Sequence, residues 1–244
     1  MYLDIISKKP DSYNKNLRQF ELDSVCTVGV HGNEPFAIRF RNSLYRKVQV
    51  KLSLDGTDIL TGQVANLDAS SKMWVVNGLG SMMLSAWPES NHGGAAFVFT
   101  DAVSSVAAHT HGDMTAKGYI SCAIWTEGYT PPTEDLFAIA DYGGITSKSF
   151  SGGERTMGID RGPAIGAGAY QSQHIRSAQG LIQPQFLKIM QVRYLWWDDL
   201  VTKLQEAGIS PQMQHPTGFH GGIDLGSTPR IGEAQQAPQH SRFA

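Results

Sequence analysis

The chain has few charged residues and few cysteines, and each shortage excludes a class of protein. Charged residues make up 17% of the sequence and the net charge is −2, whereas an average domain is about 25% charged. Without a basic excess the chain lacks the electrostatic footprint of a nucleic-acid-binding protein, so we expect no direct nucleic-acid partner. Cys26 and Cys122 lie far apart and lack CxxC spacing, so we expect free, buried thiols, not a disulfide framework or a zinc site.

Long hydrophobic runs are also missing. No window approaches the roughly 20 apolar residues that a membrane-spanning helix needs, and MYLDIISKKPDSYNK at the start lacks the apolar run of a secretory signal peptide. These absences predict a protein that is made in the cytoplasm and has no membrane partner.

Alternation of apolar and polar residues dominates residues 22–127. In KVQVKLSL, Val48, Val50, Leu52 and Leu54 share one face of a strand. The segments FAIRF, SMMLSAW, AAFVFT and YISCAIW alternate in the same way, with turn clusters such as HGNEP, DGTD and PESNHGG between them. Short strands without helical periods between them predict a mainly β fold, an antiparallel β-sandwich that is Ig-like or jelly-roll-like.

The remaining segments read differently. Residues 1–21 are interpreted as an N-terminal arm, and residues 128–184, with ten glycines, as a Gly-rich extended segment. Residues 185–208 predict a strand followed by a short helix. Residues 209–244 carry four prolines and no apolar stripe, so they are interpreted as an extended C-terminal tail.

The stretch RYLWWDDLVTKL places two of the five tryptophans directly before a predicted helix. Asp198 is the expected N-cap, Asp199 adds negative charge to the first turn, and Gly208 is the expected C′ residue. A helix this short must dock on other structure. We expect one tryptophan ring to be fully buried and the other to face a partner. The candidate partner-interface residues are Trp196, Trp197, Leu200 and Leu204.

The cluster HTHGD is the strongest candidate for a metal site. His109 and His111 would lie on one side of an extended strand, with Asp113 as a third ligand. The cupin pattern, however, requires a glycine and a glutamate where this chain has Val103 and Thr115. We therefore expect no metal, and keep a metal-dependent β-sandwich enzyme using His109 and His111 as an alternative.

Other catalytic patterns are incomplete. RGPAIGAGAYQ lacks the third glycine of a dinucleotide-binding loop and the Lys-Ser/Thr of a phosphate-binding loop. The sequence has no Gly-x-Ser-x-Gly motif, and Asp198 and Asp199 diverge at a helix start, so they do not form a catalytic pair. We therefore expect no enzymatic activity and no cofactor.

Several phrases together resemble a family of β-sandwich proteins from tailed bacteriophages. They are VKLSLDGTDILTG, WVVNGLGSMMLSAWPES with AAFVFT, GYISCAIWTEG, VRYLWWDDL and GIDLGSTPRIG. The resemblance implies a virion structural protein present in several copies, most simply a capsid decoration protein whose arms bind neighbouring subunits. It also allows a head–tail junction or fibre-attachment protein, with the major capsid, head–tail or fibre proteins as partners. A carbohydrate-binding module using exposed Trp74, Trp87 or Trp125 is a further alternative.

Overall fold

Strands make up most of the regular structure. The computed structural model describes residues 1–10, 14–127 and 162–211. The strands are β1 (Tyr2–Ser7), β2 (Gln19–Leu22), β3 (Val25–Val30), β4 (Phe36–Arg41), β5 (Val48–Leu54), β6 (Thr57–Asp58), β7 (Trp74–Val76), β8 (Ser81–Leu84), β9 (Ala86–Ser90), β10 (Gly93–Asp101), β11 (Tyr119–Glu127), β12 (Pro163–Ser172) and β13 (Pro184–Trp196). The helices in these ranges are α1 (Val106–Thr110) and α3 (Trp197–Glu206). None of them is long and apolar enough to cross a membrane.

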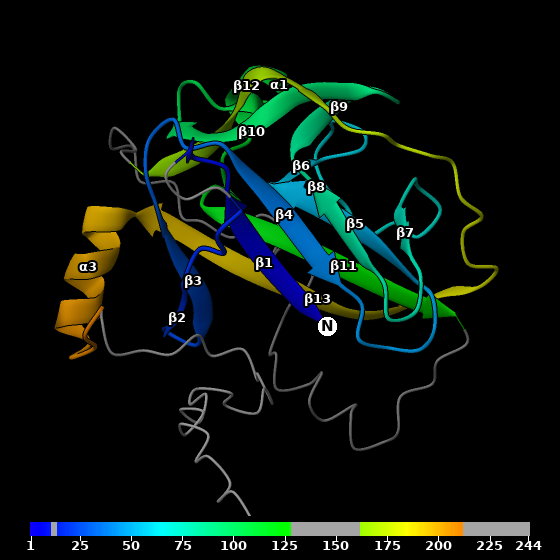
Figure 1. Ribbon diagram of the computed structural model, residues 1–244, viewed down its shortest axis with the longest axis horizontal. Helices are drawn as coiled ribbons and strands as arrows, with labels where there is room; N and C mark the ends of the chain where they lie inside the picture. The colour runs from blue at the N-terminus through cyan, green and yellow to red at the C-terminus, as the bar shows by residue number, and fades with distance from the viewer. Residues whose placement is uncertain (11–13, 128–161, 212–244) are drawn as a thin grey trace, which may run out of the picture.

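The strands form three sheets. The large sheet has the order β2-β3-β13-β11-β5-β6, with β7 also paired to β5. The front sheet is β1-β4-β8, and the upper sheet is β12-β10-β9. Figure 1 shows the front sheet lying over β13, β11 and β5, with the upper sheet across one end. The fold is therefore mainly β and sandwich-like, as the alternation predicts.

One continuous hydrophobic core lies between the sheets. The large sheet contributes the predicted inner face of β5, namely Val48, Val50, Leu52 and Leu54, each at most 1% exposed. The front and upper sheets contribute phenylalanines, and the rings of Phe36 and Phe99 stack with centroids 4.1 Å apart. Because all three sheets share this core, none of them can bury its apolar face without the others.

The outer face of β5 is less exposed than its polar residues predict. Lys51 is only 6% exposed, and its ammonium donates to Asn66 O (3.1 Å), Asn66 Oδ1 (2.8 Å) and Asp68 O (2.5 Å). Three acceptors replace the water that the buried cation loses. The side chain thereby fixes the loop after β6 against the back of the sheet.

The cysteines are free, as expected. Cys122 is fully buried in the core, whereas Cys26 is partly buried and donates to Gln19 Oε1 at 3.1 Å.

The predicted division into a domain and arms differs from the structure. Residues 1–21, predicted as an arm, contain β1, which pairs with β4 over six residues, and all but the last residue of β2. Within the predicted Gly-rich segment 128–184, residues 163–172 form β12, which pairs with β10. The remainder of that segment, 128–161, and residues 212–244 of the predicted tail lie outside the described residues.

Strand β13 extends the sandwich beyond residues 22–127. It pairs antiparallel with β11 from Pro184 to Arg193, and parallel with β3 from Arg193 to Trp196. In the strand order β13 lies between β3 and β11, so it connects the pair β2-β3 to the strands β11-β5-β6. The predicted strand of residues 185–196 is confirmed, but it lies inside the sandwich.

We predict that a fragment of residues 22–127 does not unfold cooperatively. Removing β13 leaves the edges of β3 and β11 unpaired and opens one side of the core. Residues 1–211 should give a single urea transition followed by circular dichroism. A cooperative transition of similar midpoint in the short fragment would contradict the central role of β13.

Candidate functional site

The Asp55-Gly56 turn that the sequence marks connects β5 to β6. Asp55 has φ 51° and Gly56 has φ 78°, and the flanking pairs are Leu54–Thr57 and Ser53–Asp58. Positive φ at both central residues is the type I′ geometry, which Asp-Gly favours because it matches the twist of the strands. The hairpin forms although β6 has only two residues.

The Asp55 side chain points into the molecule and binds three distant segments. Its carboxylate is 1% exposed and accepts from Gly118 N at 2.9 Å, Ile165 N at 2.7 Å and the Tyr194 hydroxyl. These donors belong to the residue before β11, to β12 and to β13. The carboxylate thus ties the hairpin turn to both the large and the upper sheets.

Burial dominates the electrostatics of this pair. Desolvation raises the pKa of Asp55 from 3.8 to about 6, although the hydrogen bonds from Tyr194, Gly118 and Ile165 partly offset it. Burial, together with the neighbouring Asp55 carboxylate, raises the pKa of Tyr194 well above its usual value. Tyr194 therefore stays a hydroxyl donor. Neither group reaches solvent, so the pair is suited to holding the fold together and not to proton exchange with a substrate.

His111 meets Thr57 beside the same turn. His111 Nε2 lies 2.9 Å from Thr57 Oγ1, and the backbone N–H of Asp113 donates to His111 Nδ1 at 3.1 Å. A neutral ring that accepts at Nδ1 carries its proton at Nε2 and donates to Thr57. A histidine that activates a hydroxyl nucleophile must instead accept the hydroxyl proton at an unprotonated ring nitrogen. Thr57 is also fully buried. The contact closes the turn and does not form a catalytic pair.

The extended geometry that the His109–His111 metal alternative requires is not present. Residues 106–110 form α1, with Ser105 as N-cap accepting from Ala108 N at 3.2 Å, and His111 is its C-cap. The Ser105 cap favours a helix here. His109 Nδ1 lies 2.8 Å from Ser105 O, on the helix itself, while the Asp113 carboxylate accepts from Thr115. In the described residues no group of three or more potential metal ligands converges, at this cluster or elsewhere.

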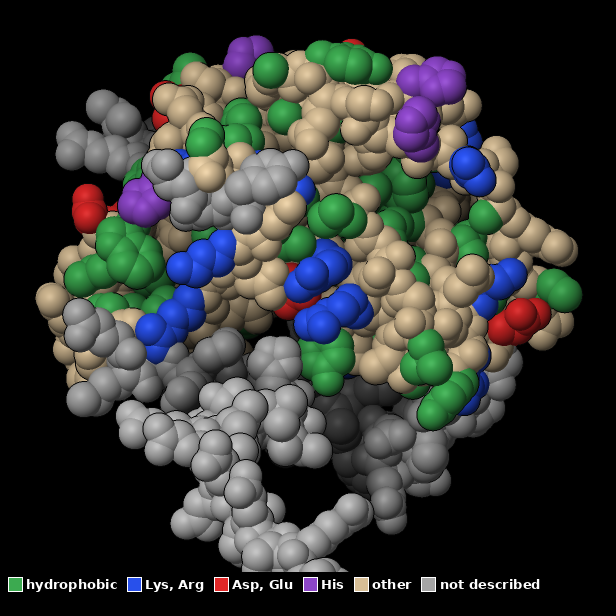
Figure 2. Space-filling view, in the orientation of Figure 1, with side chains coloured by type: hydrophobic (Ala, Val, Ile, Leu, Met, Phe, Trp, Pro, Cys, Tyr) green, Lys and Arg blue, Asp and Glu red, His purple; other side chains and the backbone are tan. Residues whose placement is uncertain are grey.

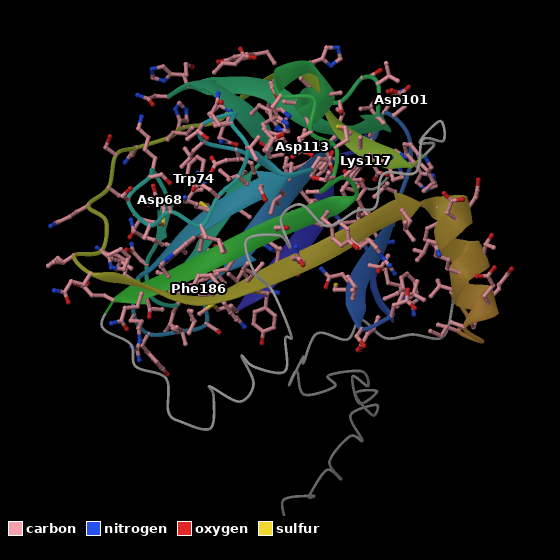
Figure 3. All side chains as sticks on the ribbon, turned by 180° about the vertical axis from the view of Figure 1, so that it is seen from behind. Asp68, Trp74, Asp101, Asp113, Lys117 and Phe186 are labelled. Carbon is pink, nitrogen blue, oxygen red and sulfur yellow. The ribbon has the colours of Figure 1, made fainter. Side chains whose placement is uncertain are left out.

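The three tryptophans considered for carbohydrate binding do not present an exposed platform. Trp87 is 8% exposed and donates to Gly166 O at 3.1 Å. Trp125 is 2% exposed, and Phe186, which is labelled on β13 in Figure 3, meets it edge-on with ring centroids 5.6 Å apart. Trp74 is partly buried and packs against the main core. Stacking of a sugar ring would need an open aromatic face, which the buried Trp87 and Trp125 do not offer.

The predicted helix after the tryptophans is confirmed, but its start is different. Strand β13 runs directly into α3, so Trp196 is the N-cap residue, without a side-chain cap, and Trp197 is the first helical residue. Asp198 was expected as the N-cap; instead it lies with Asp199 in the first turn. Both carboxylates there are favoured by the helix dipole.

Leu200 and Leu204 anchor α3 to its own chain. Both are fully buried against Phe20 and Leu22 of β2. The helix ends in a Schellman motif, since Gly208 has φ 69°, its N–H bonds to Gln205 O at 3.0 Å, and Ile209 N bonds to Leu204 O at 2.7 Å. Gly208 is thus confirmed as the C′ residue. Both leucine side chains are used inside the chain and have no exposed surface.

The two tryptophans diverge at the strand–helix junction. Trp196 is partly buried and packs against the main core, whereas Trp197 is 36% exposed. Neither ring is fully buried, contrary to the expectation for one of them. Trp197 sits on the backbone of Gly29, where a Cβ atom would lie 2.5 Å from Trp197 Cε3. A glycine in β3 therefore provides the space that this ring occupies.

His31 lies beside Trp197. Its ring centroid lies 6.1 Å from that of Trp197. The loop that carries it is held by the buried Glu34, whose Oε2 accepts from His31 N at 3.3 Å and whose Oε1 accepts from Ser7 Oγ at 2.6 Å. Gly29, His31 and Trp197 are named the Trp197 surface here. Figure 2 shows hydrophobic side chains beside a histidine on the side of the molecule where α3 lies.

Comparisons of the chain with protein-family models, with curated proteins and with solved structures give no match.

We predict that Asp55→Ala destabilises the fold by at least about 3 kcal/mol. The substitution leaves two buried donors, Ile165 N and the Tyr194 hydroxyl, and the partly buried Gly118 N without an acceptor, and each unpaired buried donor costs about 1–3 kcal/mol. Tyr194→Phe removes one donor and should cost about 1–2 kcal/mol. Asp101→Ala, at the exposed last residue of β10, is the matched control and should change the free energy of unfolding by less than about 1 kcal/mol. If urea titrations gave equal losses of unfolding free energy for the Asp55 and Asp101 variants, the structural role of the Asp55 carboxylate would be contradicted.

The raised pKa of Asp55 also predicts the direction of a pH dependence. Between about pH 4 and 6 the folded state holds a proton on Asp55 that the unfolded state has released, so the contribution of this group to stability falls as pH rises. Asp55→Asn does not titrate. The free energy of unfolding of the parent minus that of Asp55→Asn should decrease by about 2–3 kcal/mol from pH 4 to pH 7. A difference that is constant with pH, or rises, would show that Asp55 is not protonated more readily in the folded state.

Proposed function

We propose that this protein is a non-enzymatic structural subunit of a tailed-bacteriophage virion, a capsid decoration protein that binds neighbouring subunits in the particle. The observation that carries the proposal is Trp197, a large ring that is 36% exposed although its helix is firmly docked. An aromatic side chain that remains exposed on a fixed support is a typical anchor for a protein partner.

The support beneath Trp197 favours binding. The helix is held by Leu200 and Leu204, and the ring lies against Gly29. A ring already fixed in place loses little conformational freedom when a partner covers it. The neighbouring His31 adds a polar group at the rim, on a loop that Glu34 holds in place.

The phrases that carry the phage resemblance also support the proposal. VKLSLDGTDILTG, GYISCAIWTEG and VRYLWWDDL contribute β5 with its turn, β11, and β13 with the start of α3. These strands are neighbours in the large sheet, in the order β13-β11-β5-β6. The resemblance therefore concerns the framework of the sandwich together with the segment that presents Trp197.

We predict that Trp197→Ala abolishes stable incorporation into particles. The protein should be present in purified virions, at a copy number that mass spectrometry can measure against the major capsid protein. The variant should remain folded, with a stability loss of about 1–2 kcal/mol, because part of the ring is already exposed. Co-sedimentation of purified variant with particles lacking the protein should fall to background.

Matched controls separate loss of binding from loss of folding. Tyr45→Ala removes an aromatic ring that is 91% exposed elsewhere and should bind like the parent. Gly29→Ala keeps the Trp197 side chain, but the new Cβ would lie 2.5 Å from Trp197 Cε3 and 2.8 Å from Leu200 Cδ2. It should therefore shift the ring together with the start of α3 and weaken binding. Normal binding by a folded Trp197→Ala protein would refute this interface. A copy number far below that of the major capsid protein would favour a head–tail junction or fibre-attachment position over capsid decoration.

A further inference from the structure

Two histidines distant in sequence lie together at one end of the upper sheet. His92 is in the turn between β9 and β10, and His174 follows β12. Their ring centroids are 6.0 Å apart and the rings are nearly perpendicular, at 84°. Both residues are exposed, and Figure 2 shows two histidine side chains side by side over the β9–β10 region.

The backbone holds these two positions in register. Gln173 N donates to His92 O at 2.9 Å and Ile175 N donates to Asn91 O at 2.9 Å, so the chain after β12 continues to pair with the β9–β10 turn. On the turn itself, His92 N donates to Ser90 Oγ at 3.2 Å. The Cα atoms of the two histidines are therefore fixed, while their side chains remain free to rotate at the surface.

The ring separation suits coordination of a single ion. Two imidazoles that bind one ion with metal–nitrogen bonds of about 2.0–2.1 Å, at adjacent coordination positions, place their centroids about 5 Å apart. The observed 6.0 Å is slightly longer. A rotation of either exposed side chain between its accessible orientations closes the difference.

We propose that His92 and His174 form a two-histidine site for a divalent transition-metal ion of the Cu²⁺, Ni²⁺ or Zn²⁺ class. Imidazole nitrogen favours these ions over Mg²⁺ and Ca²⁺, which prefer oxygen ligands. In the described residues no third His, Cys, Asp or Glu side chain joins the pair. Water completes the coordination, and the ion is exchangeable, not a resident cofactor.

The test is titration of the full chain with NiSO₄ or CuSO₄ by isothermal calorimetry, after removal of metal with EDTA. The parent, His92→Ala, His174→Ala, the double variant and His109→Ala are compared. Because one ion bridges both rings, either single substitution should weaken the same binding event about tenfold or more, and nearly as much as the double substitution does. His109→Ala is the matched control and should bind like the parent, since its ring belongs to α1.

Two results would overturn the site. Unchanged binding in the double variant would place the ion elsewhere on the chain. Losses of metal affinity that are small in each single variant, and that add up in the double variant, would show that the two histidines bind metal independently and do not form a chelate. With Cu²⁺, electron paramagnetic resonance should report two nitrogen ligands in the parent and one fewer in each single variant.

Discussion

The buried carboxylate of Asp55 is the interaction on which the arrangement of the sheets depends. It is an acceptor with no proton of its own when ionised, and it meets three donors from segments that are distant in sequence. An asparagine of the same shape would direct an N–H group at one of these donors. Desolvation works against the charge, as the raised pKa shows, yet removing the carboxylate would leave two backbone amides and the Tyr194 hydroxyl without an acceptor. The turn therefore connects the large sheet to the upper sheet as well as β5 to β6.

Local sequence patterns predict the parts of this fold that depend on neighbouring residues. The alternation of β5, the Asp-Gly turn and the Gly208 helix end each follow from a few adjacent side chains. The parallel pairing of β13 with β3 does not, because it brings Tyr194 beside Val28 across most of the chain. The sequence does not predict strand β12, because its glycines are typical of an extended, Gly-rich segment. In the sheet they serve close packing, since a Cβ on Gly168 would lie 2.7 Å from the Val98 side chain.

The histidines show that sequence spacing alone also fails to predict which side chains lie together in the fold. The spacing of HTHGD implies a shared strand face, but the Ser105 cap starts a short helix that contains His109 and has His111 as its C-cap. The His109 ring contacts Ser105 O of the same segment, whereas the His111 ring contacts Thr57 of the β5–β6 hairpin. The His92–His174 pair has no sequence spacing that marks it. It depends on the antiparallel pairing of β10 with β12, whose first pair is Gly93 with Ser172. A pair of ligands that strand register brings together can be predicted only when that register is known.

The adjacent tryptophans take different roles because the chain changes conformation between them. Trp196 ends β13 and, pairing with Val30, keeps the strand geometry that directs it to the main core. Trp197 begins α3, and the helical turn brings its ring back over β3 at Gly29, the residue paired with Leu195. The parallel β3–β13 pairing thus places a residue without a side chain under the ring, and the two buried leucines of α3 hold it there. The exposure of Trp197 follows from the same contacts that dock the helix, so the surface proposed for partner binding is fixed before any partner arrives.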